Sequence, residues 1–288
     1  APAKARAREL RRLEREGKLE EFLLRWTIWA RPGQRPPDGD WRVWLLMAGR
    51  GYGKTRAGAE WIHHLAETPG LRLALVGPTE AEARAVMVEG ASGVIACAAP
   101  DNRPEWEATR ARLSWPSGSC GFVYSAANPE SLRGPEHDFA WCDEIAKWPA
   151  ADAAWDNLMF GLRRGRYPRA LATTTPRPTP LMRRLIAAAD VAMTRGRTAG
   201  NALLAESFVD YVTGLYGGTR LGRQELDGEL IEEIEGALWS RALIEAARTG
   251  PLGCFLVAGE ESGDQLGSRL MDALIRRTGG AIRFSGVG

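Results

Sequence analysis

The sequence is poor in features that would place a protein in a membrane, outside the cell or around a zinc ion. None of its apolar runs approaches the ~18 residues that a membrane-spanning helix needs. The first residues are charged and lack the apolar stretch of a secretory signal. The four cysteines lie far apart and form no C-x-x-C pair. These absences favour a cytoplasmic protein with reduced thiols, without a disulfide or zinc framework and without a membrane partner.

A glycine-rich loop follows a short apolar strand, Leu45–Ala48, and leads into an amphipathic helix. It resembles a phosphate-binding P-loop, in which glycines let backbone N–H groups converge on phosphate oxygens. Lys54 is predicted to reach the β- and γ-phosphates, and the hydroxyl of Thr55 to ligate Mg²⁺. Ala48 replaces the first glycine of the usual G-x-x-x-x-G-K-[ST] pattern, and a glycine-rich surface turn is the alternative. The predicted ATP-binding residues are Gly49, Gly51, Gly53, Lys54, Thr55 and Gln34.

Two adjacent carboxylates end a second apolar strand, Phe139–Cys142. Asp143 is predicted to hold Mg²⁺ through water, together with Thr55, and Glu144 to polarise an attacking water. An exposed acidic turn is the alternative interpretation of a lone Asp-Glu pair. The P-loop upstream and the buried strand directly before the pair favour the catalytic interpretation.

Three further sites are predicted to complete a nucleotide site. Gln34 lies on the loop that feeds the P-loop strand and is predicted to hydrogen-bond an adenine edge, with a plain linker as the alternative. Arg50 is either a solvated loop residue or a group that stabilises charge on the γ-phosphate, as an arginine finger supplied in cis. The hydroxyls at a third strand end either sense the γ-phosphate or belong to an ordinary β-branched terminus; these residues are Thr173, Thr174 and Thr175.

Charges of one sign are missing from two segments, although the net charge is only +2. Residues 161–200 hold nine arginines against one acid, and residues 224–235 hold six acids and no base. A basic block beside a nucleotide site favours a polyanionic partner. Arg163, Arg164 and Arg166 are therefore predicted to contact DNA or a neighbouring subunit's nucleotide, while solvated arginines are the commoner explanation.

Strands alternate with helices along the chain, which is typical of a parallel sheet covered on both faces. Thr79 is predicted to cap the helix after the second strand. We therefore predict an α/β fold of the P-loop NTPase type, with a mainly parallel sheet and a short C-terminal strand–helix–strand appendage. The other expected strands are Leu71–Gly77 and Ala170–Thr175, with a hairpin of Arg112–Trp115 and Gly121–Ser125. The expected helices include 3–30, 80–89, 151–163, 179–188, 203–216 and 219–227.

The same pattern predicts four segments. Residues 1–40 form an N-terminal helix with an adenine-side loop, and 41–235 form the P-loop ATPase domain. Residues 236–253 are predicted to be a linker, and 254–288 a truncated strand–helix–strand unit.

Several stretches together resemble the large terminase subunit of tailed phages and phage-like gene transfer agents, over about residues 20–248. They are the P-loop at 49–61, a Walker B region at 130–135 and 141–144, the motif at 173–178, and 219–228 with 236–239. The resemblance implies an ATP- and Mg²⁺-dependent motor that moves double-stranded DNA into a capsid. It also implies a portal or procapsid, a small terminase subunit and a ring oligomer as partners.

The resemblance carries specific roles to this sequence. It implies that Lys54 and Thr55 bind phosphate and Mg²⁺, and that Arg50 is the P-loop arginine. By the same likeness Asp143 binds Mg²⁺, Glu144 activates water, and the three threonines couple hydrolysis to motion. Members of the family usually continue into a nuclease domain of RNase H-like fold. This sequence does not resemble that continuation, so no nuclease activity is expected of this chain.

From Cys254 the sequence changes character. Residues 255–267 and 283–288 resemble the amino-terminal start of lipid-A-disaccharide synthase, a glycosyltransferase. The matching stretch is too short for a sugar-donor site, and a joined or misread gene end is the simplest explanation. Two interpretations therefore compete with the motor: a helicase-like ATPase acting on nucleic acid, and a non-functional fusion that includes the start of a glycosyltransferase.

Overall fold

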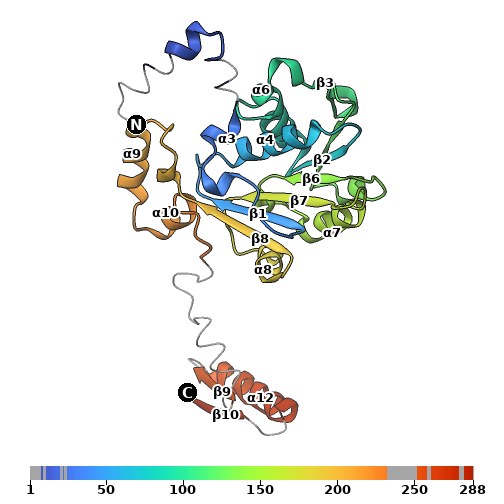
Figure 1. The fold of residues 1–288 in the computed structure, drawn as a ribbon. Helices are drawn as coiled ribbons and strands as arrows, with labels where there is room; N and C mark the ends of the chain where they lie inside the picture. The colour runs from blue at the N-terminus through green and yellow to red at the C-terminus, as the bar shows by residue number, and fades with distance from the viewer. Residues whose placement is uncertain are drawn as a thin grey trace. The chain divides into compact units, whose positions relative to one another are not determined.

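The computed structural model describes residues 8, 11–19, 22, 25–231, 252–257, 261–278 and 282–287 (Figure 1). The chain divides into two compact units, Ala1–Ile231 and Glu232–Gly288. Residues 236–251 of the predicted linker lie outside the described residues, and so does the stretch 236–239 that contributed to the resemblance. Residues 252 and 253 already belong to a strand.

The larger unit is built on one eight-stranded sheet. Its strands are β1 (Val43–Ala48), β2 (Arg72–Gly77), β3 (Glu105–Glu107), β4 (Arg112–Ser114), β5 (Cys120–Ser125), β6 (Phe139–Cys142), β7 (Arg169–Thr174) and β8 (Val191–Gly196). Their order across the sheet is β3-β4-β5-β2-β6-β7-β1-β8. The six strands from β5 to β8 pair in parallel, and the predicted hairpin forms part of the antiparallel edge β3-β4-β5.

Helices cover both faces of this sheet (Figure 1). The α-helices are α3 (Trp26–Trp29), α4 (Lys54–Ala66), α5 (Glu80–Glu82), α6 (Val94–Cys97), α7 (Ala151–Gly161), α8 (Pro180–Ala187), α9 (Glu206–Tyr216) and α10 (Arg220–Glu225). Single turns of 3₁₀ helix are Pro32–Gln34, Pro100–Asn102, Ala108–Arg110, Pro129–Leu132, Ile145–Lys147 and Thr198–Gly200.

The core follows from strands that are apolar on both sides, as the centre of a parallel sheet requires. All six residues of β1 are buried. Trp44 and Leu46 pack with residues of α4 on one face, whereas Leu45 and Met47 pack with residues of α7 and α8 on the other. This two-sided packing confirms the predicted α/β fold class.

Side-chain caps set the start of several helices. Thr79 caps α5 as predicted, since its Oγ1 accepts a 3.2 Å hydrogen bond from the N–H of Glu82. The chain then continues as a π helix, Ala83–Val88, rather than as α-helix to residue 89. Thr179 and Thr219 cap α8 and α10 in the same way, each accepting from the backbone N–H three residues further on.

Two expectations about the elements were wrong in the part of the chain that the structure describes. The predicted helix over 3–30 is interrupted at Gly17, whose φ of +67° is a common helix stop. Its apolar half contributes only the short helix α3. The strand β8 was not predicted, because none of its residues is buried and it lacks the apolar run that marks a central strand.

The C-terminal unit has the predicted strand–helix–strand form. It consists of β9 (Leu252–Val257), α12 (Glu261–Thr278) and β10 (Ile282–Val287). The two strands pair in parallel, with Ile282 opposite Leu252. A parallel strand pair joined by a helix is a single βαβ unit, the smallest piece of an α/β sheet.

Replacing Gly58 with alanine should destabilise the larger unit. A Cβ at Gly58 on α4 would lie 2.1 Å from the ring of Trp141, which is fully buried. Overpacking of this kind costs ~1–3 kcal/mol, which outweighs the higher helix propensity of alanine. Gly214 in α9 has open space around it, so Gly214→Ala should raise the free energy of unfolding by ~0.5–1 kcal/mol. Denaturant unfolding of both variants checks this, and shifts of the same sign would contradict it.

Candidate phosphate-binding site

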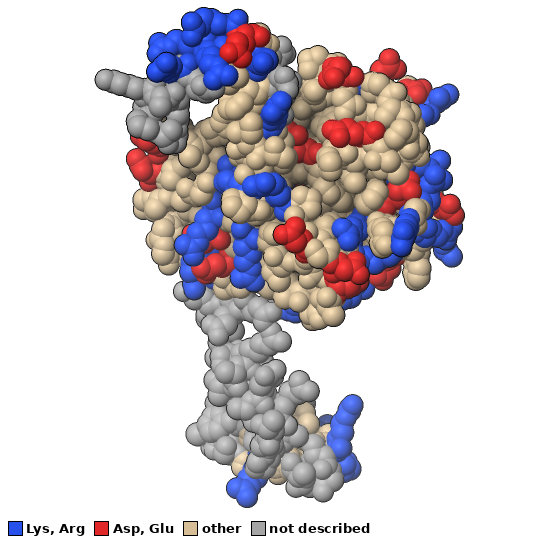
Figure 2. Space-filling model, in the orientation of Figure 1, with Lys and Arg blue, Asp and Glu red and all other residues tan. Residues whose placement is uncertain are grey.

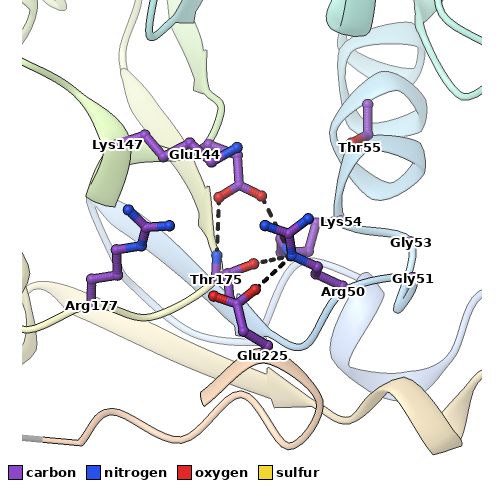
Figure 3. A pocket seen from close by; sticks show the side chains of 10 residues that line it. All are labelled: Arg50, Gly51, Gly53, Lys54, Thr55, Glu144, Lys147, Thr175, Arg177 and Glu225. Atoms are coloured by element: carbon purple, nitrogen blue, oxygen red, sulfur yellow. Dashed lines mark hydrogen bonds and ion pairs between the residues drawn. The ribbon is translucent and has the colours of Figure 1, made fainter. Parts of the chain in front are cut away.

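The sheet order brings three sequence motifs to one edge. The P-loop follows β1, Asp143 and Glu144 follow β6, and Thr175 follows β7, which lies between the other two strands. Because the three strands are parallel, their carboxyl ends meet at the same edge, where ligands bind in sheets of this type. A cavity of about 330 Å³ opens there (Figure 3). It is lined by Arg50, Gly51, Gly53, Lys54, Thr55, Glu144, Lys147, Thr175, Arg177 and Glu225.

The glycines of the loop have different tasks. Gly51 and Gly53 have φ angles of +74° and +94°, which glycine adopts without strain. Gly49 allows a close approach, since a Cβ there would lie 2.2 Å from the carbonyl oxygen of Leu226. Ala48 is the last residue of β1 and is fully buried. The departure from the usual P-loop pattern therefore falls on a strand residue and leaves the loop itself intact.

Lys54 is the first residue of α4 and places its ammonium group inside the site. The side chain is buried, and Nζ donates to the carbonyl of Ala48 at 3.0 Å and to Oγ1 of Thr175 at 2.9 Å. Nζ also lies 3.5 Å from Oε1 of Glu144. The N-terminus of α4 adds the positive end of a helix dipole at the same place. Both groups favour an anion such as phosphate.

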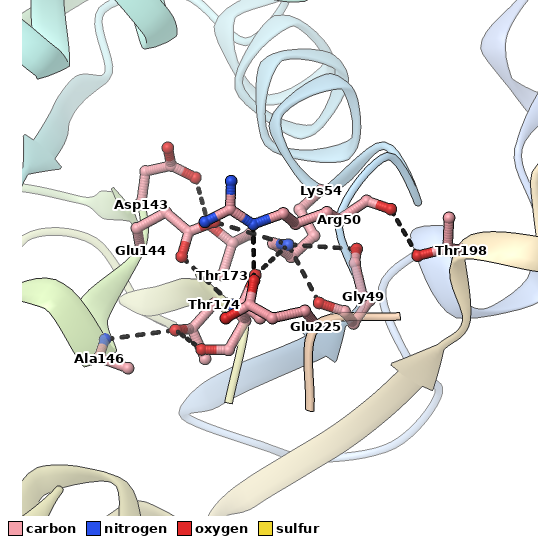
Figure 4. A network of polar contacts seen from close by, with 12 residues as sticks. Gly49, Arg50, Lys54, Asp143, Glu144, Ala146, Thr173, Thr174, Thr198 and Glu225 are labelled. Carbon is pink, nitrogen blue, oxygen red and sulfur yellow. Dashed lines mark hydrogen bonds and ion pairs between the residues drawn. The ribbon is translucent and has the colours of Figure 1, made fainter. Parts of the chain in front are cut away.

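Asp143 is buried behind the cavity and is not among its lining residues. Its Oδ1 accepts a 2.6 Å hydrogen bond from Oγ1 of Thr173 (Figure 4). Burial raises the pKa of Asp143 to about 6, and the neighbouring charge of Glu144 adds to the effect. A buried carboxylate of this kind favours a nearby cation. With the hydroxyl of Thr55 on the cavity wall, it forms an oxygen donor set that fits Mg²⁺, an ion that keeps several waters.

Glu144 adopts a left-handed backbone conformation, with φ of +49°. Non-glycine residues rarely do so, and such strained positions cluster at functional sites. Its carboxylate accepts a 3.2 Å hydrogen bond from the N–H of Thr175, and its other oxygen faces Lys54. The side chain is thereby directed at the P-loop, where a general base for phosphoryl transfer has to lie.

The three threonines of the third motif connect the two halves of the site. Oγ1 of Thr173 contacts Asp143, and Oγ1 of Thr175 accepts from Lys54. Oγ1 of Thr174 accepts a 3.3 Å hydrogen bond from the N–H of Ala146, on the turn after Glu144 (Figure 4). All three are buried. A displacement at either motif therefore reaches the other through β7.

Gln34 is buried beneath the P-loop. Its Nε2 donates to the carbonyl oxygens of Gly53 at 2.9 Å and of Tyr52 at 3.2 Å, and its Oε1 accepts from the N–H of Arg31. These contacts make Gln34 a support of the loop backbone. The predicted adenine contact stays a prediction, since both amide hydrogens already have protein partners.

Three lining residues were not predicted: Lys147, Arg177 and Glu225. The first two had a local signal. Lys147 lies three residues after Glu144, and Arg177 belongs to the stretch that follows the threonines. Nothing around Glu225 in the sequence points to the cavity, because it lies 175 residues from its partner Arg50.

The structure does not bring the arginines of the 161–200 block into the cavity, apart from Arg177. Arg163, Arg164 and Arg166 lie between α7 and the start of β7, at the edge opposite the P-loop. Six strand residues at ~3.3 Å each separate the two edges by about 20 Å. A contact of these arginines with nucleotide therefore requires another subunit.

Their charge is also largely neutralised by acids from elsewhere in the chain. Arg163 pairs with Glu136 at 2.7 Å, and Arg164 with Asp138 at 3.3 Å. On the face shown in Figure 2, basic and acidic side chains of the larger unit are interspersed. The basic block of the sequence is thus not a uniformly basic surface in space.

The family of the chain follows from its sequence as a whole. A family model for the N-terminal part of the large terminase subunit, T4likevirus type, matches residues 45–246. The chain belongs to the large terminase family. This match spans every element of the phosphate-binding site from β1 to Glu225.

Solved large terminases share the fold. The ATPase domain of the Thermus phage P74-26 large terminase is 19% identical, with a TM-score of 0.52, over 68% of this chain and 94% of that one. A full-length large terminase from a thermophilic bacteriophage, in complex with ADP, is 12% identical, with a TM-score of 0.56, over 73% of this chain and 52% of that one. The larger unit therefore has the fold of a terminase ATPase domain, and the chain spans about half the length of the ADP-bound terminase.

A second similarity is short. Lipid-A-disaccharide synthase of Nitrobacter winogradskyi is 68% identical over 34 residues, which are 12% of this chain and 9% of that protein. The match agrees with the resemblance seen in residues 254–288. It covers too little of the synthase to carry its activity to this chain.

Proposed function

We propose that this chain hydrolyses ATP with Mg²⁺ and uses the free energy to move double-stranded DNA into a capsid, as the motor part of a large terminase. The observation that carries the proposal is the position of Thr175. It accepts a hydrogen bond from the P-loop lysine and donates its N–H to Glu144. The phosphate-binding and water-activating groups are thus in one hydrogen-bonded unit.

In this mechanism Lys54 and the N–H groups of the glycine loop bind the β- and γ-phosphates. Asp143 and Thr55 hold Mg²⁺, which neutralises phosphate charge when it is bound. Glu144 orients the attacking water and accepts its proton. Arg50, on the cavity wall, balances the negative charge that develops on the γ-phosphate.

Coupling to motion is assigned to the three threonines at the end of β7. Their hydroxyls contact Asp143, Lys54 and the turn that follows Glu144. Loss of the γ-phosphate changes the hydrogen bonds available to Lys54 and Glu144, and Thr173–Thr175 pass the change to the sheet. This role distinguishes a motor from a simple hydrolase.

The proposed partners are those of a packaging motor: duplex DNA, a portal or procapsid, a small terminase subunit, and further copies of this chain in a ring. The arginines at 163, 164 and 166 contact DNA phosphate or the nucleotide of a neighbouring copy. Gln34 supports the loop and contacts adenine from its edge. The absence of nuclease activity stays a prediction. No helix in the described residues is long and apolar enough to cross a membrane.

The test is ATP turnover with and without duplex DNA. Lys54→Ala should weaken nucleotide binding at least about tenfold, because a charged hydrogen-bond donor to phosphate contributes ~1.5–3 kcal/mol. The matched control is Lys18→Ala, whose side chain is 63% exposed and which should behave like the parent. Parent-like nucleotide affinity in Lys54→Ala would overturn the site assignment.

The same assay separates the competing functions. A packaging motor should be stimulated by duplex DNA and should not separate its strands. Strand separation driven by ATP would favour the helicase-like interpretation. UDP-sugar binding without any ATP turnover would favour the glycosyltransferase fragment.

A further inference from the structure

Glu225 brings a negative charge from outside the nucleotide-binding motifs into the phosphate cavity. It is the last residue of α10, and its side chain is only 15% exposed. Its Oε2 lies 2.6 Å from Nε of Arg50, and its Oε1 accepts a 3.2 Å hydrogen bond from Gln224 (Figure 3). The arginine of the P-loop is thus already paired with a carboxylate of the protein.

The surrounding charges make this carboxylate an ion. Burial alone would raise the pKa of Glu225, but the hydrogen bond and charge of Arg50, with Gln224 and Arg177, outweigh burial and lower the pKa. In turn, the pKa of Arg50 is raised by its hydrogen bond to Glu225. A carboxylate and a phosphate oxygen offer an arginine the same short, charge-assisted hydrogen bond. The two therefore compete for one guanidinium.

The backbone ties this charge pair to the loop. The N–H of Arg50 donates to the carbonyl of Glu225 at 2.7 Å, and Oγ1 of Thr198 donates to the carbonyl of Arg50 at 2.6 Å. Gly228, with φ of +68°, packs so closely on the end of β1 that a Cβ would lie 2.9 Å from Cα of Ala48. A change in the side-chain partner of Arg50 is therefore transmitted directly to the end of α10.

The helices beyond this contact are held lightly by the rest of the unit. No residue of α9 is buried, and in α10 only Gly222 is. Tyr211 and Leu215 of α9 are 67% and 53% exposed. Elements with few buried contacts open at low free energy. The charge pair at Glu225 is thus positioned to control how firmly α10 is held.

We propose that Glu225 is a positioning residue that occupies the place of the terminal phosphate beside Arg50, so that binding of a nucleoside triphosphate displaces it and loosens α10. This inference rests on the proposed function, because it assumes that the cavity binds a nucleotide. The carboxylate holds Arg50 in the cavity while no nucleotide is bound. When the triphosphate binds, Arg50 exchanges the carboxylate for phosphate oxygens, and α10 loses one of its attachments to the P-loop.

The first test is equilibrium binding of a non-hydrolysable ATP analogue with Mg²⁺. Glu225→Gln preserves size and removes the competing charge, so it should bind the analogue about tenfold tighter than the parent. The matched control is Glu206→Gln on α9, an exposed acid that should leave affinity unchanged. Equal or weaker binding in Glu225→Gln would overturn the displacement, because the carboxylate would then support the site rather than compete for it.

The second test needs no variant. Hydrogen exchange of backbone amides at 220–226 should become faster in the parent when the analogue binds, whereas in Glu225→Gln it should be fast with or without the analogue. A merely structural ion pair would give slower or unchanged exchange on binding in the parent. If the parent binds no nucleotide at any concentration, the proposed function itself fails; if it binds and exchange at α10 does not rise, only the present inference fails.

Discussion

Glu144→Gln should bind nucleotide like the parent and hydrolyse ATP on the order of 10²-fold more slowly or worse. Glutamine retains an acceptor oxygen for the N–H of Thr175, which lies 3.2 Å from the carboxylate in the parent. It also retains the size of the side chain, so the left-handed turn at this residue is unchanged. What it loses is the ability to take a proton from water. The expected loss is therefore confined to the chemical step.

Steady-state turnover and nucleotide affinity, measured on the same preparation, separate these effects. Glu130→Gln is the matched control, because this carboxylate is 73% exposed and lies on the turn Pro129–Leu132. It should show parent rates and parent affinity. Turnover near the parent rate in Glu144→Gln would mean that another group accepts the proton. Loss of binding together with turnover would instead mean that Glu144 holds Lys54 in place.

The parts of the site that the sequence predicted are those whose geometry is set within a few residues. A glycine loop between an apolar strand and a helix, and two acids at a strand end, each define a local structure. The rule that ligands bind at the carboxyl ends of parallel strands then places both at one edge. The strand order was not needed for that step, although it explains why Thr175 comes to contact Lys54 and Glu144 together.

The parts that could not be predicted depend on contacts between distant segments. Glu225 and Arg50 are separated by 175 positions, and only the fold of α10 onto the P-loop brings them together. Gln34 was assigned to the right neighbourhood, but the sequence could not show that its amide faces the carbonyl of Gly53. Such roles depend on which backbone groups remain without partners, which no local pattern reveals.

Charge patterning misled for the same reason. The arginine-rich window suggests a basic surface, yet Arg163 and Arg164 pair with Glu136 and Asp138, which lie outside the window. Counting charges along the chain ignores partners supplied by neighbouring strands and loops. Arg166 does not share this neutralisation by an acid in the described contacts and lies over the ring of Tyr167 at 5.1 Å. It is the member of the block that a DNA-binding assay should examine first.

Asp143→Asn should stabilise the protein in the absence of Mg²⁺ while abolishing Mg²⁺-supported ATP turnover. Burial raises the pKa of Asp143 to about 6, from an ordinary value of 3.8. The folded state therefore binds this proton more tightly than the unfolded state does. The cost of the buried charge is fully present above pH ~6 and is relieved as the pH falls from about 6 to 4. Asparagine removes that charge at every pH and keeps an acceptor for the hydroxyl of Thr173.

Thermal unfolding without Mg²⁺ at pH 7.5 and at pH 5 tests the first half of this prediction. Asp143→Asn should be more stable than the parent at pH 7.5, and its advantage should shrink at pH 5, where the parent's carboxyl is mostly protonated. Asp152→Asn, at a carboxylate that is 51% exposed on α7, is the matched control and should show no such dependence on pH. A variant that is less stable than the parent at pH 7.5 would mean that the charge itself supports the fold.

The second half of the prediction concerns Mg²⁺. Added Mg²⁺ with nucleotide should raise the unfolding temperature of the parent, because a ligand that binds only the folded state stabilises it. The rise should be much smaller in Asp143→Asn, since its neutral amide is a poor partner for a hard cation that prefers carboxylate oxygens. Turnover should fall on the order of 10²-fold or more, as it does when a group that organises transition-state charge is lost. A stable variant that still turns over ATP at the parent rate would remove Asp143 from the metal site, whereas a stable and inactive one would show that this buried charge lowers stability and is retained for catalysis.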